Sequence, residues 1–330
     1  MRAVRRVFHD MSRFFSFFVA ALLICPATAG ADASVPGLLA TGHVDEAIAA
    51  LDGQLKKSPD DAAAHNLLCR AYFSLGDWDR GLSSCERAVA LSPDNSQFHL
   101  WLGRIYGEKA DKSSFLTAAG LAKRVAHEFE TAVHLNPKSV DARSDLAEFY
   151  LEAPGIVGGG RDKAEQQANS LMELDPARAA WVKARLAEKH KDFTVAENEY
   201  HTAIDASHGS ASAWLNLGLF YGHRQQWDQM ESALLHVRAA TLDRPDALVD
   251  AAEILIRSQR NLPEAVELLH AYLKSGSQVE LAPQFKVHFL LGSASEKVGD
   301  KQKAAAEYQS ALELAKEYQP ARQALQRVNR

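Results

Sequence analysis

The sequence predicts an all-α protein in which about eight helix-turn-helix repeats stack into a solenoid. Three observations support this fold class. Apolar side chains recur at three- and four-residue spacing along most of the chain, which is the periodicity of amphipathic helices. Glycine and proline interrupt that periodicity at regular intervals. The whole arrangement then returns with a period of about 34 residues, and a two-helix unit of that size must stack on its copies to bury its apolar face.

The segment 62–94 shows the repeating unit most clearly. The pair Gly76-Asp77 is predicted to end a first helix and to cap a second one. Pro93 follows the second helix, at a point where proline prevents the helix from continuing. The apolar positions that share a helix face are Leu68, Tyr72 and Leu75 in the first helix and Leu82, Cys85, Ala88 and Val89 in the second.

This pattern resembles the tetratricopeptide repeat, whose consensus is W-x2-L-G-x2-Y…A-x3-F…P. The resemblance covers nearly all of residues 36–330, and it implies a right-handed superhelical solenoid that binds protein partners. Further matches to the consensus are Trp214, Leu217, Gly218 and Tyr221 in one copy, and Leu291, Gly292, Ala304, Tyr308 and Ala311 in another.

The predicted organisation is a signal peptide over residues 1–29 and a solenoid over residues 30–330. The third repeat carries about ten extra residues over 107–121, which we expect to form a longer first helix or a protruding turn. A final helix with a polar outer face is expected to keep the solenoid soluble. In chain order, the repeats are expected at 36–61, 62–95, 96–139, 140–176, 177–210, 211–244, 245–284 and 285–317, followed by a capping helix at 320–330.

The N-terminal segment has the features of a secretory signal peptide. Arginines precede an apolar run that ends at Cys25, and the small triplet before the predicted cleavage point ends at Ala29. Translation from Met11 would give an equally suitable signal. We therefore expect export, with the periplasm as the destination and secretion or outer-membrane attachment as alternatives. Lipidation of Cys25 would make the protein an outer-membrane assembly or tethering lipoprotein, although the bulky Ile24 disfavours it. No later segment is long and apolar enough to span a membrane.

Two cysteines remain after the predicted cleavage, and both fall in the repeat 62–95. Cys69 and Cys85 are expected on facing positions of one helical hairpin. Two interpretations stay open: a pair of small buried thiols, or a disulfide bond that an oxidising compartment would favour.

The glycine-rich segment 151–164 interrupts the fourth repeat. The spacing Gly155-x4-Gly160 is that of a phosphate-binding loop, but Arg161-Asp162 follows it where Lys-Ser/Thr is required, and no strand is predicted before it. We expect an extended, flexible loop between two helices. An accessory ligand-binding role for this loop is the second alternative function. The residues that define the loop are Pro154, Gly155, Gly158, Gly159 and Gly160.

Charge and motif content disfavour nucleic-acid binding and catalysis, which leaves protein binding as the expected role. The net charge of −5 and the lack of a basic stripe with interleaved aromatics disfavour nucleic-acid binding. The 13 histidines include no H-E-x-x-H pair, and the chain has no nucleophile motif, so we expect no metal, no cofactor and no catalytic residue.

The resemblance implies that the first helix of each repeat lines a concave groove that holds an extended peptide or a partner's helix. Basic and acidic residues alternate along the predicted groove. Trp101 with Arg104, and Trp181 with Arg185, combine the residue types that anchor interfaces, so we expect the binding hot spots there. The predicted groove residues are Asn66, Arg70, Phe73, Trp101, Arg104, Asp145, Glu148, Trp181, Arg185 and Asn216.

Overall fold

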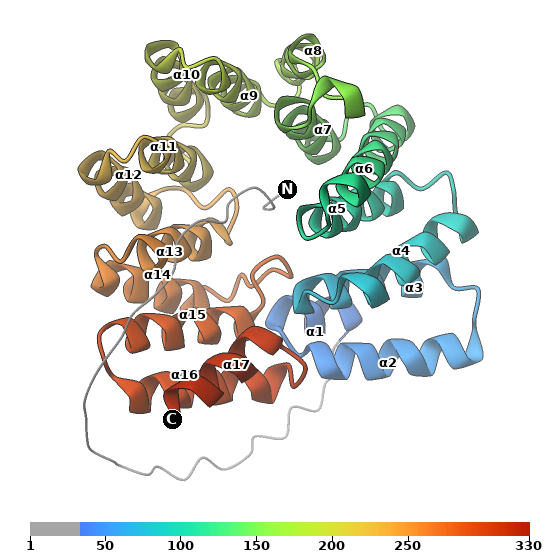
Figure 1. The fold of residues 1–330 in the computed structure, drawn as a ribbon, viewed down its shortest axis with the longest axis vertical. Coiled ribbons are helices and arrows are strands. Elements are labelled where there is room, and N and C mark those ends of the chain that lie inside the picture. Colours follow the sequence, from blue (N-terminus) through green and yellow to red (C-terminus); the bar gives the residue numbers. More distant parts are fainter. Residues whose placement is uncertain (1–33) are drawn as a thin grey trace. The chain divides into compact units, whose positions relative to one another are not determined.

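The computed structural model describes residues 34–330, and these form 17 α-helices, one 3-10 turn and no strand (Figure 1). The predicted all-α class is therefore confirmed. The predicted signal peptide over residues 1–29, including Met11 and Cys25, lies outside the described residues. The described part divides into two compact units. Unit 1 is Gln54–Ala247, and unit 2 combines residues 34–53 with Leu248–Arg330.

Unit 1 consists of consecutive antiparallel helix pairs, and we call the first and second helix of each pair its A helix and B helix. Each B helix packs against its own A helix, and the first four B helices also pack against the A helix that follows. The A helices are α3 (Ala62–Leu75), α5 (Ser96–Asp111), α7 (Val140–Glu152), α9 (Pro176–Lys189) and α11 (Ala211–His223). The B helices are α4 (Trp78–Leu91), α6 (Phe115–Leu135), α8 (Arg161–Leu171), α10 (Phe193–Ala206) and α12 (Trp227–Ala239).

Unit 2 brings the first described helices together with the last ones. The backbone N–H of Lys316 donates a hydrogen bond of 3.1 Å to Asp45 Oδ2. Tyr318 packs between the rings of Phe285 and Phe289, with centroids 4.9 and 5.6 Å away. The helices are α1 (Val35–Thr41), α2 (Val44–Lys57, shared with unit 1 at its end), α13 (Ala247–Ser258), α14 (Leu262–Lys274), α15 (Gln284–Lys297), α16 (Lys301–Leu314) and α17 (Gln319–Val328). Within residues 34–330, no helix combines the length and the apolarity that crossing a bilayer requires.

The turns follow from the residues that the sequence places between paired helices. Gly76 has φ 75°, the left-handed conformation that ends α3, and its N–H donates to the carbonyl of Phe73. The carboxylate of Asp77 then accepts from the Arg80 N–H at 3.1 Å and caps α4. Asp192 and Asp300 cap α10 and α16 in the same way.

Glycines inside the A helices allow the paired helices to approach closely. A Cβ atom on Gly103 would lie 2.5 Å from the ring of Phe129, and one on Gly292 would lie 2.5 Å from the ring of Tyr308. Both rings are fully buried. A glycine at this repeat position therefore lets an aromatic ring of the B helix contact the A-helix backbone.

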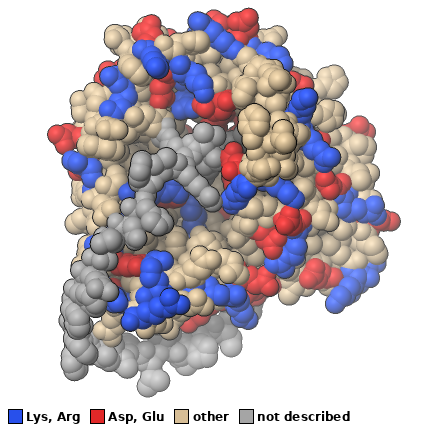
Figure 2. Space-filling model, in the orientation of Figure 1, with Lys and Arg blue, Asp and Glu red and all other residues tan. Residues whose placement is uncertain are grey.

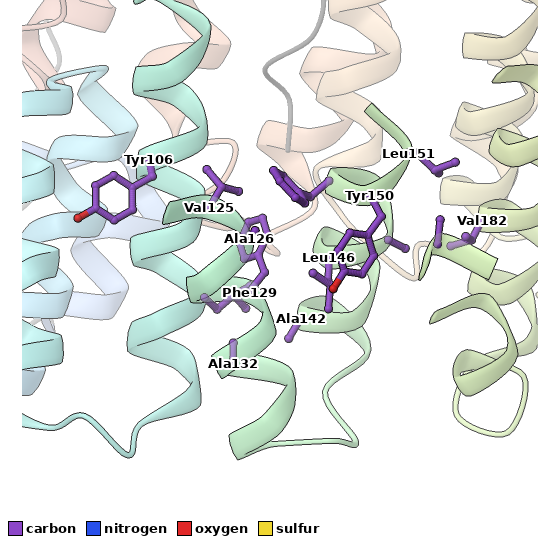
Figure 3. Packing of buried hydrophobic residues seen from close by; sticks show 14 of the residues in the cluster. Tyr106, Val125, Ala126, Phe129, Ala132, Ala142, Leu146, Tyr150, Leu151 and Val182 are labelled. Atoms are coloured by element: carbon purple, nitrogen blue, oxygen red, sulfur yellow. The ribbon is translucent and has the colours of Figure 1, made fainter. Parts of the chain in front are cut away.

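The core of unit 1 is a continuous cluster that joins successive pairs. Tyr106 of α5, Phe129 of α6, Leu146 of α7 and Val182 of α9 belong to it (Figure 3). Because each pair shares this cluster with its neighbours, burial of the apolar faces depends on stacking, as in other repeat proteins.

The structure joins Cys69 of α3 to Cys85 of α4 by a disulfide bond, with Cα atoms 5.1 Å apart. Both residues are completely buried. The position of Gly81 on α4 explains the close approach, because a Cβ atom there would lie 3.4 Å from the Cys69 carbonyl oxygen. The sequence left open either two free thiols or a disulfide bond, and the structure contains the disulfide bond.

The insertion over 107–121 differs from its expected form. It lengthens mainly the second helix of the pair: α5 ends at Asp111, and α6 begins at Phe115 and runs for 21 residues. Only Lys112, Ser113 and Ser114 separate the two helices. The physical reason is the composition after Ser114, where alanine and leucine favour continued helix.

The segment 151–164 connects two helices as expected, but the connection is shorter than expected and is not extended, because α7 continues to Glu152 and α8 begins at Arg161. The segment forms a compact 3-10 turn over Gly155–Val157, closed by backbone hydrogen bonds from Gly159 to Pro154 (3.2 Å) and from Gly160 to Tyr150 (2.9 Å). Gly158 has φ 105°, and a Cβ atom on Gly159 would lie 1.7 Å from the carbonyl oxygen of Ala153. The glycines are thus required for a tight turn rather than for freedom of movement.

Candidate functional site

The predicted groove residues lie on the A helices of unit 1, and we call the surface that these helices share the A-helix face. Trp101 of α5 lies near one end of this face. The guanidinium carbons of Arg70 and Arg104 lie 5.3 and 5.0 Å from the Trp101 ring centroid, within the range of cation–π attraction. Phe73 packs edge-on against the same ring at 5.4 Å. These contacts link α3 to α5.

A buried ion pair continues the face from α5 to α7. Arg104 Nε donates to Asp145 Oδ2 at 2.7 Å, and both side chains are less than one-fifth exposed. Burial raises the pKa of the Asp145 carboxyl, but the charge and hydrogen bond of Arg104, together with the charge of Arg178, lower it, and the net pKa lies below its ordinary value. The pair therefore stays ionised at neutral pH.

A second charge cluster links α7, α9 and α11. Arg185 donates to Glu152 of α7 at 2.6 Å, and its other terminal nitrogen lies 3.4 Å from Glu188. Glu188 also contacts the Nδ1 atom of His223 on α11. Tyr200 of α10 donates its hydroxyl hydrogen to Glu188 at 3.0 Å. Burial and then the Glu188 carboxylate raise the pKa of Tyr200 well above its ordinary value, so the phenol remains a donor.

The alternation of basic and acidic residues thus has a structural cause. Arg104 and Arg185 each pair with a carboxylate on a neighbouring A helix. With the contact of Arg70 to the Trp101 ring and that of Glu188 to His223, a row of contacts runs from α3 to α11. Over the visible surface, Lys and Arg are interspersed with Asp and Glu rather than gathered by sign (Figure 2). A partner on the A-helix face would therefore meet ordered, paired charges.

The predicted site residues differ in how much surface they offer. Asn66, Trp101 and Asp145 are 4%, 6% and 8% exposed and present little area. Trp181 lies on α9 with the Arg178 guanidinium 5.8 Å from its ring centroid. The residues that are half-buried, and so retain area for a partner, are Arg70, Phe73, Arg104, Glu148, Trp181, Arg185 and Asn216.

Sequence reasoning missed two members of the charge cluster, Glu188 and His223. With the repeats starting at residues 177 and 211, they occupy repeat positions 12 and 13. Both positions are among those that line the groove in the repeat family. The repeat position of each residue is therefore the sequence feature that predicts its place in the groove.

The glycine turn and the histidines provide no ligand geometry in the described part. The N–H groups of Gly159 and Gly160 already donate to Pro154 and Tyr150, so they are not directed at an external phosphate. Among residues 34–330, no three His, Cys, Asp or Glu side chains converge closely enough to hold a metal ion. The expectation that the protein needs neither metal nor cofactor stays a prediction.

Comparison with known proteins found a matching family profile and a related mouse protein. A family profile described as tetratricopeptide repeat matches residues 34–96, 70–110 and 250–321. The mouse Superkiller complex protein 3 is 25% identical over 308 residues, which is 87% of this chain and only 18% of that protein. The chain therefore spans less than a fifth of the length of this curated relative.

The comparison with solved structures supports the same fold through one match with a TM-score above 0.5. Yeast Tom70 superimposes with a TM-score of 0.53 and 14% identity, over 94% of this chain and 66% of that one. A thermophilic tetratricopeptide-repeat protein of Thermus thermophilus gives a TM-score of 0.45 and 21% identity, over 60% of this chain and 94% of that one. At such identities the likeness concerns the fold alone. The profile matches identify tetratricopeptide repeats over residues 34–110 and 250–321, and the stacked helix pairs of the described residues have the fold of such repeats.

Proposed function

We propose that the protein is a non-catalytic scaffold that binds an extended peptide or a helix of a protein partner on the A-helix face of unit 1. Tetratricopeptide repeats generally serve protein–protein interaction, and this supports binding as the general role. The observation that carries the finer proposal is the ordered row of contacts from α3 to α11, with Arg70 and Arg104 against Trp101 at one end.

The exposed polar edges of this row are suited to a partner that carries charges of both signs. Aromatic and arginine side chains held by neighbours lose little conformational entropy when a partner binds, so they are efficient anchors. Phe73, Trp181 and Arg185 combine partial exposure with such contacts. A peptide lying across the A helices would contact one repeat after another, and its specificity would come from the order of charges.

We further propose that the protein works after export, in the periplasm. The support is the N-terminal pattern of arginines, apolar run and small-residue triplet. The buried disulfide between Cys69 and Cys85 is in keeping with an oxidising compartment.

A charge-swap experiment tests the binding proposal. Peptides are selected from a random library on the purified protein, and their affinities are then measured for Arg104→Asp combined with Asp145→Arg. The swap keeps an opposite pair but reverses the order of charges, so we expect affinity to fall about tenfold or more while helicity and melting temperature are retained.

The matched control swaps the exposed pair Lys109 and Asp79, whose atoms lie 2.6 Å apart away from Trp101. Lys109→Asp with Asp79→Lys is expected to leave peptide affinity unchanged. Equal affinities for both swapped proteins would contradict binding on the A-helix face. A fall in melting temperature with Arg104→Asp and Asp145→Arg would show instead that the pair is structural.

A further inference from the structure

Three large apolar side chains stand out on unit 1 by their exposure. Phe115, Leu116 and Ile156 are 85%, 84% and 86% exposed, whereas the next most exposed large hydrophobic residue among those described, Val298, is 66% exposed. They occupy the two segments that depart from the repeat period: the start of the lengthened α6, and the 3-10 turn between α7 and α8. In the other repeats of unit 1 the corresponding turns are short and polar, such as Gly76-Asp77 and Gln225-Gln226.

The two segments lie on the same edge of unit 1. Both segments connect an A helix to its own B helix. Because the A helices of successive pairs run in the same direction, all such connections lie at the same end of the stacked pairs. The 3-10 turn packs directly against α6 (Figure 1), and Gly158 faces Ala126 of that helix. The first α6 residue to pack on the core is Leu121, so the turn of α6 that carries Phe115 and Leu116 projects beyond the core.

Basic side chains occur in both of these segments. The segment 112–124 contains Lys112, Lys123 and Arg124 and no acidic residue. The segment 154–163 adds Arg161 and Lys163, with Asp162 as its one acid. All five cationic residues are exposed. The two segments together hold five basic residues and one acidic residue, and Asp111 lies directly before the first of them.

Aromatic rings hold three of the cations at this edge. The Lys112 ammonium lies 3.9 Å from the Trp78 ring centroid, and the Lys163 ammonium lies 5.0 Å from that of Tyr150. The Arg124 guanidinium lies 5.4 Å from the Tyr106 ring, with Glu86 at 3.6 Å as its acidic neighbour. These three cationic groups are thus held by aromatic rings of the repeats rather than extended freely into solvent.

We propose that this edge binds an anionic phospholipid surface, with Phe115, Leu116 and Ile156 entering the boundary between headgroups and acyl chains. Isolated apolar tips suit a fluid layer, which needs no complementary shape, whereas a protein partner would need a pocket for each side chain. The surrounding lysines and arginines match the negative charge of the headgroups. The contact would hold the scaffold at a membrane and would leave the A-helix face available to its own partner.

Vesicle cosedimentation of the full chain tests this inference. The tip variant combines Phe115→Ser, Leu116→Ser and Ile156→Ser. A matched control combines Val195→Ser, Leu235→Ser and Val298→Ser, which are 45%, 46% and 66% exposed in the native protein. The vesicles contain either phosphatidylglycerol with phosphatidylethanolamine or phosphatidylcholine alone. The N-terminal apolar run is common to all three proteins and cannot cause a difference between them.

We expect the native protein and the control to bind the anionic vesicles, and the tip variant to bind them about tenfold or more weakly. Raised salt should weaken binding to the anionic vesicles, and the native protein should bind phosphatidylcholine vesicles less tightly.

Equal binding by both variants, or no binding by the native protein, would overturn the proposal. So would a native dimer that the tip variant abolishes, because a second copy would then cover the tips. Peptide affinity at the A-helix face should be the same in the tip variant, so failure of this inference and failure of the proposed function are distinguishable.

Discussion

At the scale of single residues, the most informative polar group is His99 of α5. It is 6% exposed, and both ring nitrogens face hydrogen-bond acceptors. Nδ1 lies 2.6 Å from Glu128 Oε2, and Nε2 lies 2.7 Å from the carbonyl oxygen of Pro93. A carbonyl oxygen accepts only, and a carboxylate also accepts, so the arrangement favours the doubly protonated ring. The hydrogen bond to Glu128 accordingly raises the pKa of His99 above its ordinary value of 6.5.

This pair predicts a pH dependence of stability. Because the folded pKa is raised, the contribution of His99 is fully present below the unfolded pKa of 6.5 and is lost as the pH rises through the folded pKa. The melting temperature should therefore fall as the pH rises above about 6.5. Glu128→Gln should remove the charge-assisted hydrogen bond, cost on the order of 1.5–3 kcal/mol of stability at low pH, and flatten the dependence of melting temperature on pH.

The exposed pair of His43 and Glu46 provides the control. Glu46→Gln should leave the dependence of melting temperature on pH unchanged. Parallel profiles for Glu128→Gln and the native protein would contradict this account.

At the scale of helices and turns, the sequence predicted what local chemistry determines. Gly76 and Asp77 lie where the α3–α4 turn was expected, because a left-handed glycine and an acidic cap act within a few residues. The turn at Gly155–Val157 could not be predicted in the same way. Its shape depends on the approach of Gly159 to the Ala153 carbonyl and on the bond from Gly160 to Tyr150. Glycine composition gives no such information, since it suits tight turns and flexible loops equally.

The hairpin of α3 and α4 allows a prediction at this scale. The bond between Cys69 and Cys85 closes a loop with a sequence separation of 16. In the chain-entropy description, a loop of about 15 residues corresponds to roughly 3 kcal/mol of stabilisation. Cys69→Ser with Cys85→Ser should therefore lower the melting temperature, and a reducing agent should lower that of the native protein but not that of the variant. Equal melting of the native protein with and without reductant, together with thiol labelling of both Cys69 and Cys85 after denaturation, would show that the bond is absent from the purified protein.

At the scale of the whole molecule, the sequence identified the A-helix positions but not their pairing. Arg104 and Asp145 are separated by 41 residues, and Arg185 and Glu152 by 33. Such partners meet only because stacking brings successive A helices together. The predicted alternation of charge therefore described the order of these residues along the chain, but not the pairing that explains it.

The division into two compact units gives the last prediction. All five tryptophans lie between residues 54 and 247, so tryptophan fluorescence reports on unit 1, whereas helical circular dichroism reports on both units. Each unit also has its own buried cluster. Gly103→Ala forces a methyl group against Phe129 in unit 1, and Gly292→Ala forces one against Tyr308 in unit 2, each at about 1–3 kcal/mol.

If the units unfold separately, Gly103→Ala should lower the fluorescence midpoint in urea and split the circular dichroism transition. Gly292→Ala should move part of the dichroism transition and leave the fluorescence midpoint in place. Gly53→Ala is the control, because a Cβ atom there meets nothing within 4 Å. Repeat arrays unfold as one body only when coupling between neighbours exceeds such local costs. Identical shifts of both signals in both variants would therefore mean that the two units are energetically one.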